Sequence, residues 1–205
     1  MDRIKFPVLA GFLGPFVSLG GIFFAILLAP SFTLENALSD LGHWFRTDIG
    51  PNPLPRALIF NAGVFVSGIL MVYFLVWLMH KVPEIGTRIG LLILASSCLC
   101  LSAVGIFSEN IPYYHTLVAL GFFLIAPIAL LVIGTNWLRF SSLRLYSIPS
   151  LLMGILPFIL ISLAGQEILV WPGYALPEVI LGLNLFLWFW LLVFLESSGR
   201  LQDLQ

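Results

Sequence analysis

Six long apolar blocks constrain the fold of this chain more than any other feature of its sequence. They cover residues 6–30, 55–79, 89–107, 116–138, 145–163 and 177–195 of 205. At roughly 20 residues each, they have the length that a helix needs to cross a hydrocarbon core about 30 Å thick. Only 9% of the residues are charged, against roughly 25% in soluble domains, so the chain has too few charges to cover a water-facing surface.

The blocks predict an all-α fold, an integral membrane bundle of six transmembrane helices, because lipid offers no hydrogen-bond partners to an open backbone. We expect a single transmembrane domain over residues 1–205, in which residues 31–54 form the longest link between blocks. The first block is longer than the core of a signal peptide and is followed by a poor cleavage site. We therefore expect it to be retained as a span.

The distribution of Lys and Arg predicts that both termini lie in the cytoplasm, since basic residues gather in cytoplasmic links. In that orientation the cytoplasmic side holds seven of the nine basic residues, and the outer side holds Arg46 and Arg56. Residues 31–54 are then a long extracytoplasmic loop. We expect a multi-pass protein of the cell membrane with membrane lipids as partners. The net charge of −1 offers no basic patch for nucleic acid.

Acidic side chains and two of the three histidines fall on the opposite, outer side. These residues are Glu35, Asp40, Asp48, Glu109, Glu167, Glu178, His43 and His115. Inside the blocks, Asn61 and Asn184 lie about 10 Å below the outer surface at the rise of a helix. An amide that faces lipid is costly, so both should face inward, and together these positions predict a polar vestibule that opens outward. Glu109 and Glu167 are expected to be solvated loop charges.

Residues 35–44 form the densest polar run of the chain, Glu-Asn-Ala-Leu-Ser-Asp-Leu-Gly-His-Trp. Asp40 is a candidate general base or metal ligand, with Ser39 or His43 beside it. The alternative is turn chemistry, in which Asn, Ser and Asp side chains cap backbone N–H groups and Gly42 permits a positive φ.

His115 and Glu178 are further candidate site residues. His115 begins the fourth block, where an imidazole serves either as a ligand or acid–base group near neutral pH or as an interfacial side chain. Glu178 opens the sixth block, either as a ligand or as an acid that suits the helix dipole. With Asp40, and His43 as a substitute, they are candidates for a divalent metal, because a mononuclear zinc site needs about three protein ligands. The chain has no HExxH or CxxC motif, so the metal depends on predicted geometry alone.

Several of these residues carry a resemblance to a known family. The motif Asn36-x-x-Ser39-Asp40-Leu41-Gly42 follows the first block, Asn61 lies in the second, Gly105-x-Phe107 leads to His115, and Glu178 opens the last block. This pattern covers nearly the whole chain and resembles the six-span prokaryotic membrane proteins catalogued as "domain of unknown function 998". The resemblance implies the six-span architecture and these candidate positions, but no activity. Val179 stands where the family pattern suggests a basic residue, which argues against an ion pair there.

Our leading hypothesis is an outward-facing polar pocket for a lipid headgroup or small amphiphile. Its sharpest form is a membrane-embedded hydrolase or transferase. The candidate catalytic residues are Ser39, Asp40 and His115, and the candidate binding residues are Asn36, His43, Asn61, Glu178 and Asn184. Two other classes stay open. One is a small transporter, channel or scramblase; the other is a non-enzymatic partner that binds other membrane helices or a second copy through small residues such as Gly14 and Gly21.

Overall fold

The computed structural model describes residues 5–204 and is all-helical over that range, which confirms the predicted fold. Six helices are long and apolar enough to cross a membrane. They are α1 (Phe6–Leu27), α2 (Pro53–Lys81), α3 (Ile85–Ile106), α4 (Pro112–Trp137), α5 (Arg144–Gly165) and α6 (Ala175–Ser197). Two short 3-10 helices, η1 (Leu38–Gly42) and η2 (Arg200–Leu204), accompany them.

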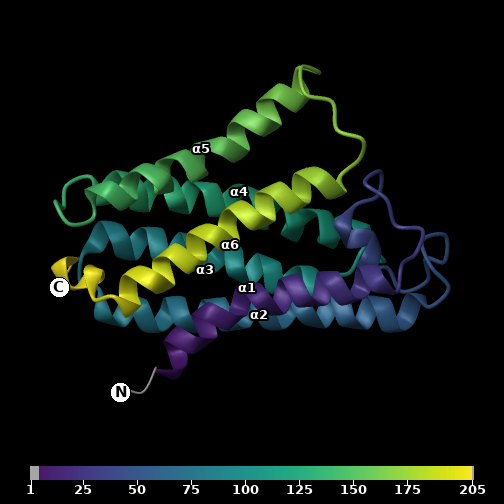
Figure 1. Ribbon diagram of the computed structural model, residues 1–205, viewed down its shortest axis with the longest axis horizontal. Coiled ribbons are helices and arrows are strands. Elements are labelled where there is room, and N and C mark those ends of the chain that lie inside the picture. The colour runs from purple at the N-terminus through teal and green to yellow at the C-terminus, as the bar shows by residue number, and fades with distance from the viewer. Residues whose placement is uncertain (1–4, 205) are drawn as a thin grey trace.

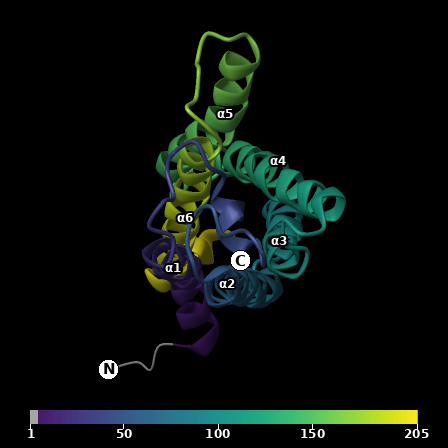
Figure 2. The ribbon, with the colours of Figure 1, turned by 90° about the vertical axis from the view of Figure 1, so that its right-hand side faces the viewer.

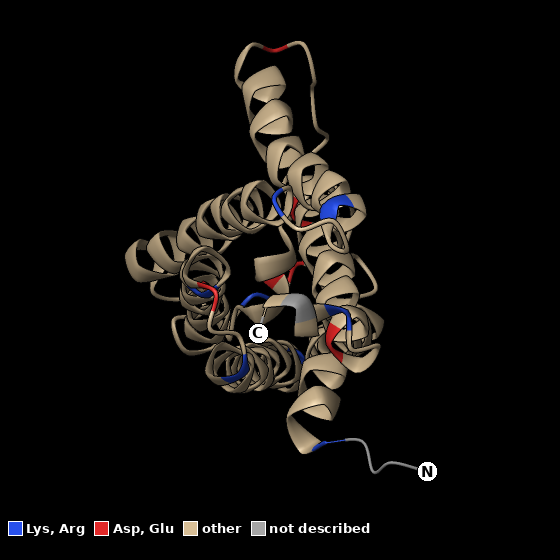
Figure 3. Ribbon diagram, turned by 90° about the vertical axis from the view of Figure 1, so that its left-hand side faces the viewer, with Lys and Arg blue, Asp and Glu red and all other residues tan. Residues whose placement is uncertain are grey.

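The helices run back and forth, so the bundle has two ends (Figure 1). The links at residues 28–52, 107–111 and 166–174 lie at one of them, the loop end. Both described chain ends lie at the other, the terminal end, with the links that follow α2 and α4. Figure 3 looks onto the terminal end and shows the Lys and Arg residues gathered there. This is the distribution from which we predict that the terminal end faces the cytoplasm.

Consecutive helices pack side by side from α1 to α5, and α6 returns to lie against α1 (Figures 1 and 2). The close approach of α1 and α2 depends on small residues. A Cβ on Gly21 would lie 3.0 Å from the Cα of Gly63, and a Cβ on Gly14 would lie 2.7 Å from the side chain of Met71. Both glycines of α1 therefore pack against α2 within the chain, so neither is free to bind a helix of another protein.

α5 is the least buried helix of the bundle. Its most apolar window is 17% buried, against 33–50% in the other five helices. Seen end-on, its loop-end half projects beyond its neighbours (Figure 2). In a membrane, most of the surface of α5 therefore faces lipid.

Polar contacts between helix ends hold the terminal end together. Glu84 caps α3 by accepting hydrogen bonds from two amide N–H groups of its first turn, at 2.6 and 2.9 Å. Arg139 pairs with the same carboxylate at 3.3 Å, and Lys81 pairs with Glu196 of α6. Burial opposes the ionisation of Glu84, but the hydrogen bonds outweigh it, so the pKa of Glu84 is lowered.

Candidate functional site

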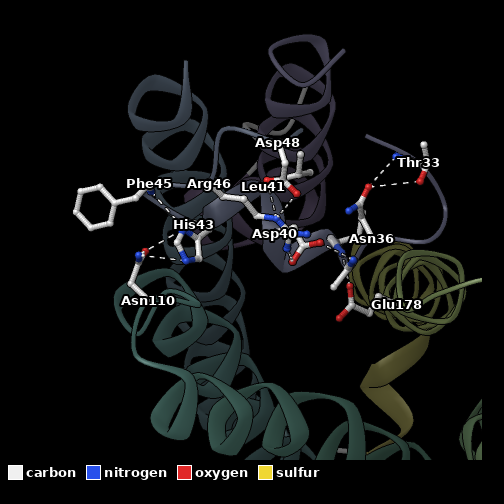
Figure 4. A network of polar contacts seen from close by, with 12 residues as sticks. Thr33, Asn36, Asp40, Leu41, His43, Phe45, Arg46, Asp48, Asn110 and Glu178 are labelled. Atoms are coloured by element: carbon white, nitrogen blue, oxygen red, sulfur yellow. Dashed lines mark hydrogen bonds and ion pairs between the residues drawn. The ribbon is translucent and has the colours of Figure 1, made fainter. Parts of the chain in front are cut away.

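The loop end is closed by residues 28–52, within which η1 forms a lid on the bundle; the lid is Leu38–Gly42. Asp40 shapes this turn from within, because its Oδ2 accepts a hydrogen bond from the amide N–H of Ala37 at 3.0 Å. Its Oδ1 pairs with Arg46, which also donates to both carboxylate oxygens of Asp48 at 3.0 and 3.1 Å (Figure 4). Asp40 is therefore buried and has a partner on each oxygen.

Arg56 of α2 anchors the lid from below. Its side chain is 0% exposed, and its guanidinium donates to the backbone carbonyls of Leu41, His43 and Arg46 at 3.3, 3.2 and 2.8 Å. A charged donor strengthens each of these hydrogen bonds, so one side chain fixes the path of the loop. The sequence shows Arg56 only as an outer charge, because it does not reveal that three loop carbonyls converge on it.

A second contact from α2 holds the end of the lid. The Nδ2 of Asn61 donates to the carbonyl of Gly42 at 3.0 Å. A Cβ on Gly42 would lie 2.5 Å from the Oδ1 of Asn61 and 2.8 Å from the ring of Phe60. Glycine is therefore required here by close approach, and Gly42 does not adopt the positive φ that glycine permits. Asn61 faces inward as expected, but its partner is the lid.

A cavity of about 80 Å³ lies beneath the lid and is lined by α1, α2, α3, α4 and α6. Its walls are mostly apolar and include four phenylalanine rings. Four lining residues are polar: Ser18, Ser39, His115 and Glu178. The last three come from the lid and from the first turns of α4 and α6, so the hollow beneath the lid is apolar with polar groups at its loop end.

Glu178 and His115 each keep one atom free for a further partner. The Oε2 of Glu178 accepts a hydrogen bond from the amide N–H of Leu38 at 2.6 Å, which leaves Oε1 (Figure 4). Among the described residues, no Lys or Arg pairs with this carboxylate. The Nδ1 of His115 lies 2.8 Å from the carbonyl of Phe107 and must donate to it, so in the neutral imidazole Nε2 is left as an acceptor.

A model of the family described as "Protein of unknown function (DUF998)" matches residues 12–195, which run from α1 to near the end of α6. The chain belongs to this family. The match confirms the resemblance expected from the sequence. No curated protein and no solved structure matches the chain. Membership of DUF998 therefore agrees with the architecture, and any chemistry has to be argued from the geometry.

In this DUF998 protein the predicted site residues fall into two groups. Ser39, His115 and Glu178 line the same cavity. The remaining predicted residues do not line it; they are Asn36, Asp40, His43, Asn61 and Asn184. The position of each residue at the loop end was predictable, whereas the division between cavity and lid depends on which way each side chain points.

Two of the predicted asparagines connect elements of the bundle. The backbone carbonyl of Asn36 accepts a hydrogen bond from the amide N–H of Ala175 at 2.7 Å, which ties the loop to the start of α6, while its side-chain Oδ1 accepts from the amide N–H of Thr33 at 2.9 Å within the loop. The side chain of Asn184 donates to the carbonyl of Met153 at 2.8 Å, which fastens α6 to α5. Asn184 therefore faces inward as expected, but it contributes to helix packing away from the cavity.

The candidate metal ligands are not assembled into a ligand set. Over residues 5–204, no group of three His, Cys, Asp or Glu side chains is placed to hold a metal ion. Asp40 is bound within the lid, whereas His115 and Glu178 line the cavity. His43, the substitute ligand, lies 3.5 Å from the side-chain amide of Asn110. The geometry thus offers no support for a metal-dependent reaction.

Glu109, in the link between α3 and α4, is a polar feature that sequence reasoning missed. The expectation of a solvated charge is wrong, because the side chain is half-buried and its Oε2 has no hydrogen-bond partner in the described chain. Burial and then the adjacent Asp40 carboxylate raise the pKa of Glu109 to about 7, although Arg46 opposes the rise. The spacing of residues 40 and 109 in the sequence does not predict that they are neighbours, so only the fold reveals this pair.

Proposed function

We propose that this protein binds an amphiphile in the cell membrane, with the polar end of the ligand beneath the lid and its apolar part along the cavity walls. The cavity carries the proposal, because apolar walls with a few polar groups at one end are typical of small-molecule sites. Its volume of about 80 Å³ is below the roughly 150 Å³ of an apolar cavity that admits benzene. It therefore suits a small head group and the first few methylene groups of a chain.

A narrow apolar crevice between α4, α5 and α6 adjoins the cavity. It shares the rings of Phe122 and Phe123 with the cavity and extends to Leu181 and Leu185. Its volume of about 10 Å³ is too small for a chain, so the helices have to part slightly for one to lie there. Because α5 is the least buried helix, it is the element that moves with the smallest loss of packing.

A cavity-filling variant tests the proposal. Gly182 lines the cavity, and a Cβ on it would meet nothing within 4 Å, so Gly182→Leu fills the space without a clash at the backbone. Gly20→Leu is the matched control, because Gly20 is equally unobstructed and does not line the cavity. We expect dodecanol to raise the unfolding temperature of the wild-type protein and of Gly20→Leu in neutral detergent, but not that of Gly182→Leu. Equal stabilisation of both variants would overturn the proposal.

Hydrolysis or group transfer is a second candidate, favoured by one arrangement. Ser39 and His115 line one cavity, and the carbonyl of Phe107 orients His115 so that Nε2 is available to take a proton. An ester-linked amphiphile is then the substrate class, with the hydroxyl of Ser39 as nucleophile. We expect Ser39→Ala and His115→Gln to abolish cleavage of a p-nitrophenyl fatty ester and His43→Gln to preserve it. Cleavage that survives both cavity substitutions would remove this candidate.

A further inference from the structure

We infer that the head group of the ligand is a protonated aliphatic amine that pairs with Glu178; this inference rests on the proposed amphiphile site. The polar atoms that the cavity leaves free are acceptors: the Oε1 of Glu178 and the Nε2 of His115. The two serine hydroxyls of the lining accept as readily as they donate. None of the described residues that line the cavity is Lys, Arg, Asn or Gln. A ligand that complements these groups must bring N–H or O–H donors.

The carboxylate of Glu178 favours a ligand whose hydrogen-bond donor is also a cation. A carboxylate beside an apolar cavity is costly unless a positive charge or several donors compensate it, and the donors of the lid to Glu178 are neutral backbone amides, Leu38 at 2.6 Å and Ser39. An ammonium group supplies both the missing charge and up to three donors.

The cations at the loop end are already engaged elsewhere. Arg46 pairs with Asp40 and Asp48, and Arg56 is buried beneath the lid with three backbone carbonyls as acceptors. Neither pairs with Glu178. The position after Glu178 is Val179, so a neighbouring basic residue does not neutralise the carboxylate either.

The electrostatic potential of the loop end also favours a cation. Acidic side chains outnumber the two guanidinium groups at this end of the bundle even with Glu109 in its neutral form. Such a field attracts cations and repels anionic head groups such as phosphate monoesters. The phenylalanine rings of the cavity wall also favour a cation over an anion, because the face of an aromatic ring is electron-rich.

A series of four dodecyl amphiphiles tests the inference on the purified full-length protein in a neutral maltoside detergent. Dodecylamine, dodecanol, dodecyltrimethylammonium and dodecyl phosphate share one chain and differ in charge and in N–H or O–H donors. Binding is measured by native mass spectrometry and by calorimetry against a detergent-only blank. We expect dodecylamine to bind at least about 10-fold more tightly than dodecanol, as a charge-assisted hydrogen bond implies. We expect dodecyltrimethylammonium, which has no N–H donor, and dodecyl phosphate to bind more weakly than dodecylamine.

Two substitutions separate pairing at Glu178 from a general effect of charge. Glu178→Gln keeps a carbonyl oxygen for the amide of Leu38 and removes the negative charge. Glu35→Gln removes one charge from the same end at an exposed side chain. We expect Glu178→Gln to abolish the preference for dodecylamine over dodecanol and Glu35→Gln to retain it, with unfolding temperatures confirming that both variants fold.

The outcomes distinguish this inference from the proposed function. If dodecanol and dodecylamine bind equally and both are lost in Gly182→Leu, the amphiphile site stands and the amine is wrong. If dodecyltrimethylammonium or dodecyl phosphate matches dodecylamine, the amine is wrong as well. If none of the four amphiphiles binds, the proposed function itself fails.

Discussion

Glu109 makes the stability of the loop end depend on pH in a direction opposite to that of most carboxylates. Its pKa is about 7 in the folded protein, against an ordinary value of 4.5. Between these two pH values the folded state holds a proton that the unfolded state has released. The free energy of unfolding should therefore fall as pH rises from 4.5 to 7, and the loss should be complete above pH 7.

The size of this effect follows from burial. Each pH unit between the two pKa values is worth about 1.4 kcal/mol, so a fully buried carboxyl with this shift would lose ~3 kcal/mol. Glu109 is only half-buried, and solvent screening reduces the loss to ~1–2 kcal/mol. The groups that act on it are the carboxylates of Asp40 and Glu178, which favour the protonated form, and the guanidinium of Arg46, which opposes it.

Unfolding by SDS in mixed micelles, followed by tryptophan fluorescence between pH 5 and pH 8, measures this dependence. Glu109→Gln imitates the protonated side chain, so it should match the wild type at pH 5 and exceed its stability by ~1–2 kcal/mol at pH 8. Glu35→Gln is the control and should follow the wild-type curve. The pKa values of Asp48 and Glu84 are lowered, so the stability that those carboxylates contribute is lost only below this range. If Glu109→Gln brings no gain at pH 8, the argument that Glu109 is held in its neutral form is refuted.

Three further substitutions test the packing that positions the site. Gly68→Ala should destabilise the bundle by about 1–3 kcal/mol, because its Cβ would lie 2.5 Å from the backbone carbonyl oxygen of Cys98. The control Gly20→Ala should change stability by less than about 0.5 kcal/mol, and unfolding by SDS compares the two variants. Arg56→Met should remove three charge-assisted hydrogen bonds and cost ~2–4 kcal/mol, and it should expose the loop at the loop end to limited proteolysis. Glu84→Ala should lose the cap of α3 and lower stability by ~1–2 kcal/mol, measured by the unfolding temperature at neutral pH.

The bundle was predictable because lipid leaves the backbone few choices, and apolar blocks of sufficient length must become helices. The observed bounds of the helices differ from those of the predicted blocks where aromatic residues lie at the membrane interface. α4 begins at Pro112, not at Thr116, because Tyr113, Tyr114 and His115 belong to its first turn although their hydropathy suggests a link. Amphipathic rings of this kind suit the membrane interface in helical conformation.

The candidate site was predictable only in part. His115 and Glu178 lie at block ends and Ser39 lies in the link between two blocks, all on the same side of the membrane, so topology alone brings them to one end of the bundle. Arg56 and Glu109 could not be assigned from the sequence, because the role of each depends on burial and on partners that the loop supplies. A charge near the end of an apolar block gives the same pattern whether it is solvated or enclosed.

The way in which the lid is fastened also determines how a molecule can reach the space below it. Arg56 and Asn61 secure the loop to α2, while Ala175 and Glu178 secure it to α6, so lifting it into water breaks hydrogen bonds on two sides. Between α4 and α6 the described residues form no hydrogen bond, and the crevice on that flank is held by side-chain packing and by the single hydrogen bond from Asn184 of α6 to Met153 of α5. The easier path therefore lies in the plane of the bilayer, and exchange should follow the mole fraction of ligand in the membrane more closely than its concentration in solution.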